Sequence, residues 1–135
     1  MFFLDANVFL YAAGSPHPLR GPCQNLIERV AHGSLPATTN AEVLQEILHV
    51  QGRKGRLNEA ILLVTCLHLL LKEILPVTGT DVRAACEILH RHPGFAIRDA
   101  IHVATMRLNG IKAIISVDPD FDRIPDIQRI PPEKT

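Results

Sequence analysis

The sequence predicts an α/β domain with a mostly parallel central sheet. Short apolar runs alternate along the chain with segments whose apolar residues recur at helical spacing. No repeat, low-complexity segment or internal linker interrupts this alternation. The 135 residues, of which 47% are hydrophobic, fit one domain better than two. We therefore expect a single domain over residues 1–135 with one functional site.

The expected elements follow one another in a regular order. Apolar runs bounded by polar residues, Gly or Pro predict strands at residues 2–4, 35–38, 74–77 and 111–117, with an edge strand at 127–130. Helical spacing predicts helices at residues 7–13, 23–31, 40–50, 57–71 and 80–92, and a last helix from residue 99 to about residue 110. The polar stretch 51–56 separates the third helix from the fourth.

Composition narrows the classes of partner and compartment. Fourteen basic and fourteen acidic residues give no net charge, so a polyanionic partner must be bound by a local patch. Three cysteines without a close pair argue against a disulfide framework or a zinc knuckle and favour a reducing, cytoplasmic compartment. The apolar amino terminus has no cationic lead and contains Asp5, unlike a signal peptide. The longest later apolar stretch, 60–71, is shorter than the roughly 20 residues that a membrane span requires, so we expect no membrane association.

Acidic residues recur where the expected strands end and the expected helices begin. Asp5 follows the first strand and Asp118 follows the fourth, while Glu42 and Asp99 lie in the first turns of two helices. Each acid alone has an ordinary explanation as a helix cap, a first-turn acid or a turn residue. Ligands of open parallel sheets, however, bind outside the carboxyl ends of the strands. The shared position of the four acids therefore predicts one acidic site.

Converging carboxylates need a counter-charge. Two carboxylates about 4 Å apart repel each other by ~4 kcal/mol at an effective dielectric constant near 20. Four of them require a cation or raised pKa values, and oxygen ligands suit Mg²⁺ or Mn²⁺. Such a site is typical of phosphodiester hydrolysis. The segment that begins at Asp118 does not fit an EF-hand calcium loop, because Arg123 and Arg129 occupy the positions at which that loop needs Gly and Glu.

Four segments carry a resemblance to a known family. FLDANVFLYA, PATTNAEVLQEIL, IRDAIHVATM and ISVDPDF resemble, in this order, the four acidic segments of the PIN-domain family, and within it the VapC toxins of toxin-antitoxin pairs. The resemblance spans nearly the whole chain and implies a three-layer α/β/α PIN-like domain. It implies metal-site acids at four positions, Asp5, Glu42, Asp99 and Asp118. It also implies supporting polar groups at Asn7 and Ser116.

Two assignments stay open within this resemblance. Glu46 lies one helical turn beyond Glu42 and is the alternative acid of the second segment. Asp120 lies two residues beyond Asp118 and is the alternative acid of the fourth segment. Helix geometry favours Glu42, because it lies at the amino terminus of its helix, toward the expected strand ends.

The resemblance implies a function as well as a fold. It implies an Mg²⁺- or Mn²⁺-dependent endoribonuclease that leaves a 5′-phosphate, forms a homodimer and is silenced by a cognate antitoxin protein. RNA as the substrate follows from the resemblance alone. One alternative is a catalytically inactive PIN-fold binding module. The other is a phosphatase with Asp5 as nucleophile, although Asn7 stands where the haloacid-dehalogenase-like signature has a second Asp.

Three further features have two interpretations each. Arg53, Lys54 and Arg56 form the densest basic cluster, which fits phosphate contacts or an ordinary solvated loop. His102 follows Asp99 by three residues, and we expect it to be a packed structural residue rather than a metal ligand. The helix at 57–71 is apolar beyond a single stripe, which predicts a self-association or antitoxin surface, or else complete burial.

Overall fold

Five parallel strands form the central sheet, in the order β3-β2-β1-β4-β5. The computed structural model describes residues 1–135. The strands are β1 (Phe2–Leu4), β2 (Ala37–Asn40), β3 (Ile74–Leu75), β4 (Ala113–Ile115) and β5 (Gln128–Ile130). The chain moves outward from β1 to β3 and then crosses to β4 on the other side of β1. This reversal opens a crevice at the carboxyl ends of β1 and β4, where ligands of such sheets bind.

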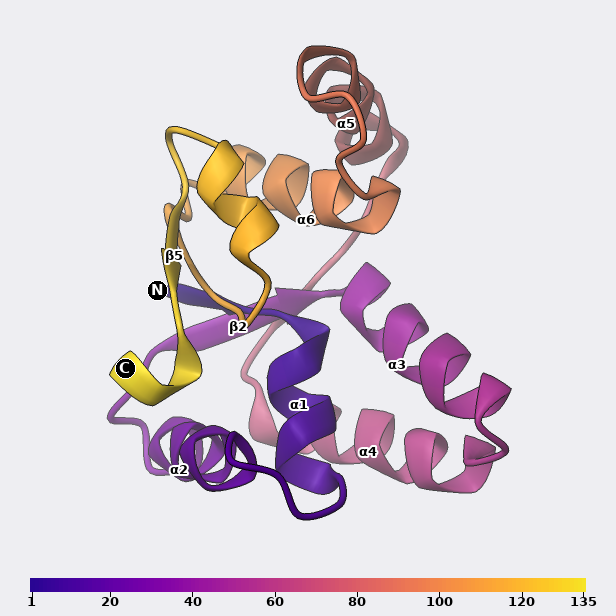
Figure 1. The fold of residues 1–135 in the computed structure, drawn as a ribbon, viewed down its shortest axis with the longest axis vertical. Helices are drawn as coiled ribbons and strands as arrows, with labels where there is room; N and C mark the ends of the chain where they lie inside the picture. The colour runs from indigo at the N-terminus through magenta and orange to yellow at the C-terminus, as the bar shows by residue number, and fades with distance from the viewer.

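The helices cover both faces of the sheet, which confirms the α/β/α prediction. Figure 1 shows α1, α2 and α4 below the sheet, α5 and α6 above it, and α3 leaving the end of β2. The α-helices are α1 (Ala6–Ala13), α2 (Arg20–Ala31), α3 (Ala41–Arg53), α4 (Leu57–Leu70), α5 (Gly79–Arg91) and α6 (Ile97–Leu108). Two short 3₁₀ helices are η1 (Pro119–Arg123) and η2 (Pro132–Lys134). No helix combines the length and the apolar character needed to cross a bilayer.

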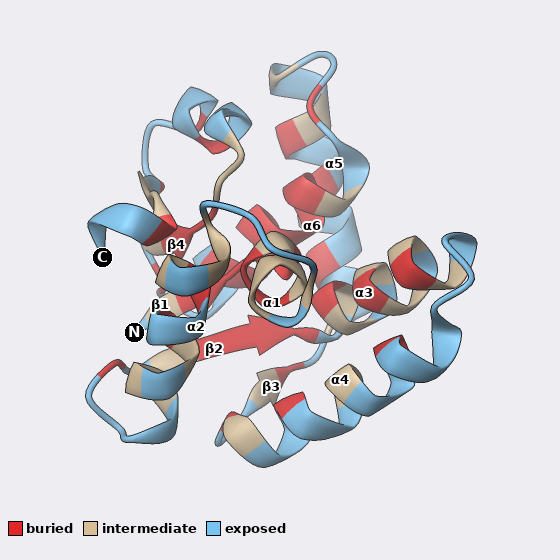
Figure 2. Cartoon of the chain, turned by 60° about the horizontal axis from the view of Figure 1, so that its bottom comes forward, coloured by how far each residue is buried: buried red, intermediate tan, exposed pale blue.

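The core runs through the sheet and α6, as the buried colour in Figure 2 shows. Phe3, Leu4, Ile114 and Ile115 of the two central strands are completely buried. Eight successive residues of α6, from Asp99 to Met106, are also buried, so this helix has no solvated face along that stretch. A helix in this position must bury its polar side chains too, which brings Asp99 and His102 into the interior.

Polar side chains at strand ends start the helices that follow. The Asp5 carboxylate accepts a hydrogen bond from the Ala6 N–H and caps α1. Asn40 ends β2 and caps α3 by accepting from the Val43 N–H at 3.0 Å. The Asn40 amide also donates to the Thr105 hydroxyl of α6 at 3.1 Å. These contacts fix the directions in which α1 and α3 leave the sheet.

Several expected boundaries were wrong by a few residues. The second strand lies at Ala37–Asn40 rather than 35–38, and β3 ends at Leu75 because Pro76 has no N–H for the ladder. The fourth strand is limited to Ala113–Ile115 rather than 111–117. These differences leave the acids at the carboxyl ends of their strands.

The helix boundaries differ by one to three residues, and the largest differences are in α2 and α3. The second helix begins at Arg20, three residues before the expected start, because Pro22 lies in its first turn, where an N–H has no intrahelical partner. The third helix continues to Arg53, so only 54–56 connect it to α4. Gly55, with φ of 71°, makes the reversal within this connection.

Candidate active site

Asp5 lies at the centre of the acidic site. Its backbone N–H donates to the Ile115 carbonyl at 3.1 Å, which places it between the ends of β1 and β4. Its Oδ2 accepts from the Ser116 hydroxyl at 2.6 Å and from the Asn7 amide at 3.0 Å. Only 4% of the residue is exposed, and burial raises its pKa in spite of these hydrogen bonds.

Asn7 and Ser116 form a polar brace between the two strand ends. The Asn7 amide donates to the Ser116 Oγ at 3.3 Å and accepts from the Val117 N–H at 3.4 Å. The same Ser116 Oγ accepts from the Asp118 N–H at 3.0 Å. One serine hydroxyl therefore ties Asp5 to the segment that carries Asp118.

Asp99 is the buried acid of α6. It is the third residue of that helix and is 8% exposed. Burial, followed by the charges of Asp5 and Asp118, raises its pKa to about 8. The carboxyl group therefore lies where its own negative charge is disfavoured.

The two glutamates of α3 have different surroundings. Glu46 lines a cavity together with Asp5, Asp99 and Asp118, which we call the acidic cavity. Burial and then the Asp5 charge raise the pKa of Glu46 to about 7, although the Arg98 charge opposes this. Glu42 instead pairs with Arg98, whose Nε lies 3.4 Å from its Oε1, and is not among the cavity residues. The geometry therefore favours Glu46, which sequence reasoning had kept as the alternative to Glu42.

His102 lies behind the acids without a hydrogen bond. Its side chain is completely buried, and neither ring nitrogen has a partner. Its Nε2 is 3.9 Å from the Asp5 Oδ1, and one possible ligand atom each of Asp5, Glu46 and His102 lie within 4.8 Å of one another. Burial lowers the pKa of this histidine to about 3, so the imidazole is neutral. Its ring also packs against that of Phe3, with centroids 5.4 Å apart, and its assignment as a structural residue stays a prediction.

The acidic cavity has a volume of about 420 Å³, and neither His102 nor Glu42 lines it. Four carboxylates and one guanidinium line it, namely those of Asp5, Glu46, Asp99, Asp118 and Arg98. Asp120 does not line the cavity; its N–H donates to the Asp118 Oδ1 at 2.9 Å. The structure thus brings together Asp5, Asp99 and Asp118 as the sequence predicted. Arg98 was not recognised, because an arginine at a helix start has no distinctive spacing.

The donor set fits a hard divalent cation. The cavity is lined by four carboxylates and only one guanidinium, so negative charge is in excess there. Burial raises the pKa values of three of these acids, Asp5, Glu46 and Asp99. The unpartnered ring nitrogens of His102 leave a further polar group free at the same place. Carboxylates with room for several waters are what Mg²⁺ and Mn²⁺ require.

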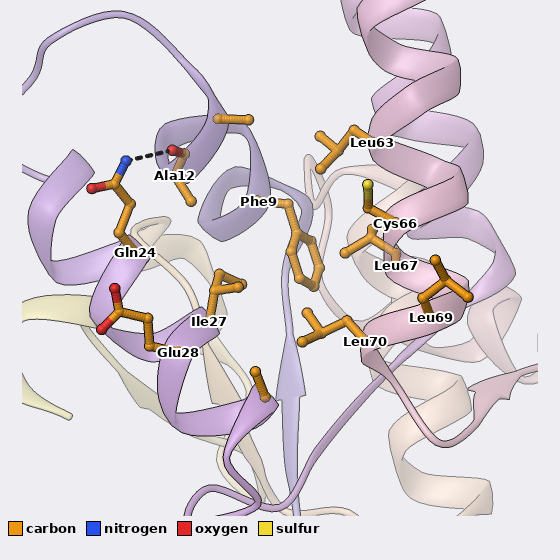
Figure 3. Close-up of a pocket in the computed structure, with 12 residues that line it drawn as sticks. Phe9, Ala12, Gln24, Ile27, Glu28, Leu63, Cys66, Leu67, Leu69 and Leu70 are labelled. Atoms are coloured by element: carbon orange, nitrogen blue, oxygen red, sulfur yellow. Dashed lines mark hydrogen bonds between the residues drawn. The ribbon is translucent and has the colours of Figure 1, made fainter.

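A larger cavity of about 860 Å³ lies on another part of the surface (Figure 3). It is an apolar groove between α1, α2 and α4, and Phe9, Ile27, Leu63 and Leu70 extend into it from these helices. Leu69, at 85% exposure, lies on its α4 side. The groove contains none of the four acids that line the acidic cavity.

Comparison with known proteins defines the class. The PIN domain family model matches residues 2–127. Ribonuclease VapC23 of Mycobacterium tuberculosis is 39% identical over 121 residues, which cover 87% of this chain and 93% of that protein. Ribonuclease VapC7 of the same organism is 33% identical over 135 residues, with 98% and 92% covered. The chain therefore belongs to the PIN-domain family, in the branch that contains the VapC ribonucleases.

Solved structures share the fold. The crystal structure of Mycobacterium tuberculosis VapC20, described as a sarcin-ricin loop cleaving toxin, has a TM-score of 0.77 and 22% identity over 93% of this chain and 95% of that chain. VapBC2 from Rickettsia felis, bound to a DNA fragment from its promoter, has a TM-score of 0.73 and 16% identity, with 96% and 97% covered. FitAcB from Neisseria gonorrhoeae has a TM-score of 0.70 and 20% identity, with 98% of both chains covered.

Proposed function

We propose that this protein is an Mg²⁺- or Mn²⁺-dependent endoribonuclease and the toxin of a type II toxin-antitoxin pair. The observation that carries the proposal is the cavity in which four carboxylates from four different segments meet at the carboxyl ends of β1 and β4. The names of the related VapC ribonucleases support RNA as the substrate. Its three free cysteines support a cytoplasmic location.

In this mechanism the side chains bind the metal ion and accept one proton from the attacking water. Asp5, Asp99 and Asp118 would hold the metal, and Asn7 and Ser116 keep the Asp5 carboxylate in place. A bound divalent ion supplies an acidified water and stabilises negative charge on the phosphoryl oxygens. Glu46, with a pKa near neutrality, is suited to accept the proton of the attacking water. We therefore place Glu46, rather than Glu42, as the site acid of the second acidic segment.

Hydrolysis by water predicts particular products. We expect purified protein to cleave structured RNA only with Mg²⁺ or Mn²⁺ and to leave 5′-phosphate and 3′-hydroxyl ends. A 2′-deoxy substitution at the cleaved position should not stop the reaction, because the 2′-hydroxyl is not the nucleophile. Gel analysis of end-labelled RNA, with EDTA and Asp5→Asn controls, measures this. Cleavage in EDTA, or 2′,3′-cyclic phosphate ends, would contradict the mechanism.

Two further measurements separate the alternatives, namely Mn²⁺ binding and the trapping of a phosphate analogue. A protein that binds Mn²⁺ but cleaves no RNA would favour the binding-module interpretation. Trapping of a phosphate analogue on Asp5 would favour the phosphatase. In the structure Asp5 is hydrogen-bonded by Asn7, where that phosphatase signature has an acid.

We further propose that an antitoxin segment occupies the apolar groove between α1, α2 and α4 (Figure 3). Proteins of similar structure include VapBC2 from Rickettsia felis and a chain of a toxin-antitoxin complex from Klebsiella pneumoniae, which supports a partner of this kind. The groove is apolar, with Gln24 and Glu28 at one side, which suits an amphipathic helix with a basic flank. The expected homodimer stays a prediction, and we assign it no surface.

Leu69→Glu should weaken antitoxin binding by at least about tenfold, because it places a charge on the groove wall. Leu62→Glu is the matched control, since Leu62 lies on the same helix, is 65% exposed and does not line the groove. Copurification with the cognate antitoxin, followed by titration, measures both variants. Equal binding by the two variants would contradict the assignment. Light scattering would show whether Leu69→Glu instead splits a homodimer, which would assign the groove to a second copy.

A further inference from the structure

A second polar pocket, of about 370 Å³, adjoins the acidic cavity. Asn7 and Leu10, both on α1, line the two cavities, so the first half of this helix separates them. On the far side the pocket is lined by Lys54 and Arg56, from the short connection between α3 and α4. The basic cluster is therefore divided, since Arg53 is not among the pocket residues.

The two cations of this pocket have no acidic partner. Lys54 and Arg56 are exposed and take part in none of the ion pairs of the structure, although the chain contains as many acids as bases. Gly55 between them has φ of 71°, which makes the tight turn that brings both to one rim. This rim is thus a local positive site beside a strongly negative one.

His17 adds an imidazole to the same pocket. Its Nδ1 accepts from the Leu19 N–H at 3.1 Å, which leaves Nε2 as the ring donor. Its ring lies against that of Tyr11, with centroids 4.6 Å apart. The pocket therefore combines two cations, one imidazole N–H and an aromatic pair, which is the chemistry that binds a phosphate and its attached nucleoside.

We propose that this pocket is a subsite for the RNA strand, where Lys54 and Arg56 bind a phosphate next to the one that is cleaved. The inference rests on the proposed function and extends it to substrate binding. The acidic cavity repels a polyanion until a metal is bound, so affinity for the strand must come from groups next to this cavity. The basic pocket contains such groups, because it adjoins the acidic cavity and shares Asn7 and Leu10 with it.

The test reverses the charge of the pocket. Lys54→Glu combined with Arg56→Glu should raise KM for RNA at least about tenfold and leave kcat within about twofold, because phosphate contacts position the strand without touching the reacting atoms. Affinity for single-stranded RNA, measured in EDTA by fluorescence anisotropy, should fall similarly. The slope of log affinity against log salt should decrease by about 0.7, the value for one lost phosphate contact on a single strand.

Arg53→Glu is the matched control, because Arg53 precedes Lys54 directly, is exposed and lies outside the pocket. It should change the salt slope and KM far less than the double variant. Thermal melts confirm that both variants fold. Equal effects of the two variants on KM and on RNA affinity, in a wild type that cleaves RNA, would overturn the subsite and leave the proposed function intact. A wild type that neither binds nor cleaves RNA would overturn both.

Discussion

Glu46→Gln should reduce RNA cleavage about 100-fold or more, whereas Glu42→Gln should reduce it less than about tenfold. The two residues lie one turn apart on α3, and only Glu46 lines the acidic cavity. Its raised pKa, about 7, lets it accept a proton near neutral pH, and glutamine cannot do so. Glu42 forms an ion pair with Arg98, so Glu42→Gln should weaken this pair and leave the proton acceptor in place.

The pH profile adds a second readout to this comparison. Wild-type activity should rise with pH as the proton acceptor ionises, and the Glu42→Gln variant should keep that rise. In Glu46→Gln the residual activity should lose that dependence. Initial rates on one RNA substrate between pH 5.5 and 8.5, with melts to confirm folding, measure both effects. Equal losses in the two variants, or a greater loss in Glu42→Gln, would restore Glu42 as the site acid.

The sequence was sufficient to predict the sheet edge that carries the site. Asp5 and Asp118 directly follow apolar runs, and parallel strands align their carboxyl ends, so their meeting follows from the alternation of strands and helices. The choice between Glu42 and Glu46 could not be made in this way. Both lie on one helix face, and only the packing of α3 against its neighbours decides which one lines the acidic cavity.

The position of β2 depended on contacts between distant segments. Thr38 donates to the Glu73 carbonyl at 2.9 Å, and Thr39 donates to the Leu4 carbonyl at 2.9 Å. These long-range hydrogen bonds allow polar residues to be buried in a strand, although their types favour a loop or a helix start. The basic pocket also depends on distant segments, because its lining residues come from α1, from α3 and from the connections that follow these two helices.

Asp99→Asn should stabilise the metal-free protein. The raised pKa of Asp99, about 8, means that the folded protein holds a proton on this carboxyl group that the unfolded chain releases above about pH 4. The free energy of unfolding of the wild type therefore decreases as pH rises from about 4 to 8. Asparagine resembles the protonated form and avoids the loss, so the advantage of the variant should grow over that range. At pH 8 it should reach a few kcal/mol, since a pKa difference of one corresponds to about 1.4 kcal/mol.

Asp126→Asn is the matched control for this substitution. The hydrogen bond from Arg107 lowers the pKa of Asp126, and the residue lies at the surface, away from the acidic cavity. Its replacement should destabilise the protein slightly and leave the response to metal unchanged. The two substitutions are therefore expected to act in opposite directions although the chemical change is the same.

Thermal melts of wild type and Asp99→Asn at pH 8, in EDTA and in millimolar Mn²⁺, test the metal-site assignment most directly. In EDTA the variant should melt several degrees above wild type, because a repelled buried charge has been removed. With Mn²⁺ the wild type should gain stability by mass action and the variant much less. A variant that melts below wild type in EDTA and shows the same metal-induced increase would contradict the account, since Asp99 would then be only a favourable first-turn acid of α6.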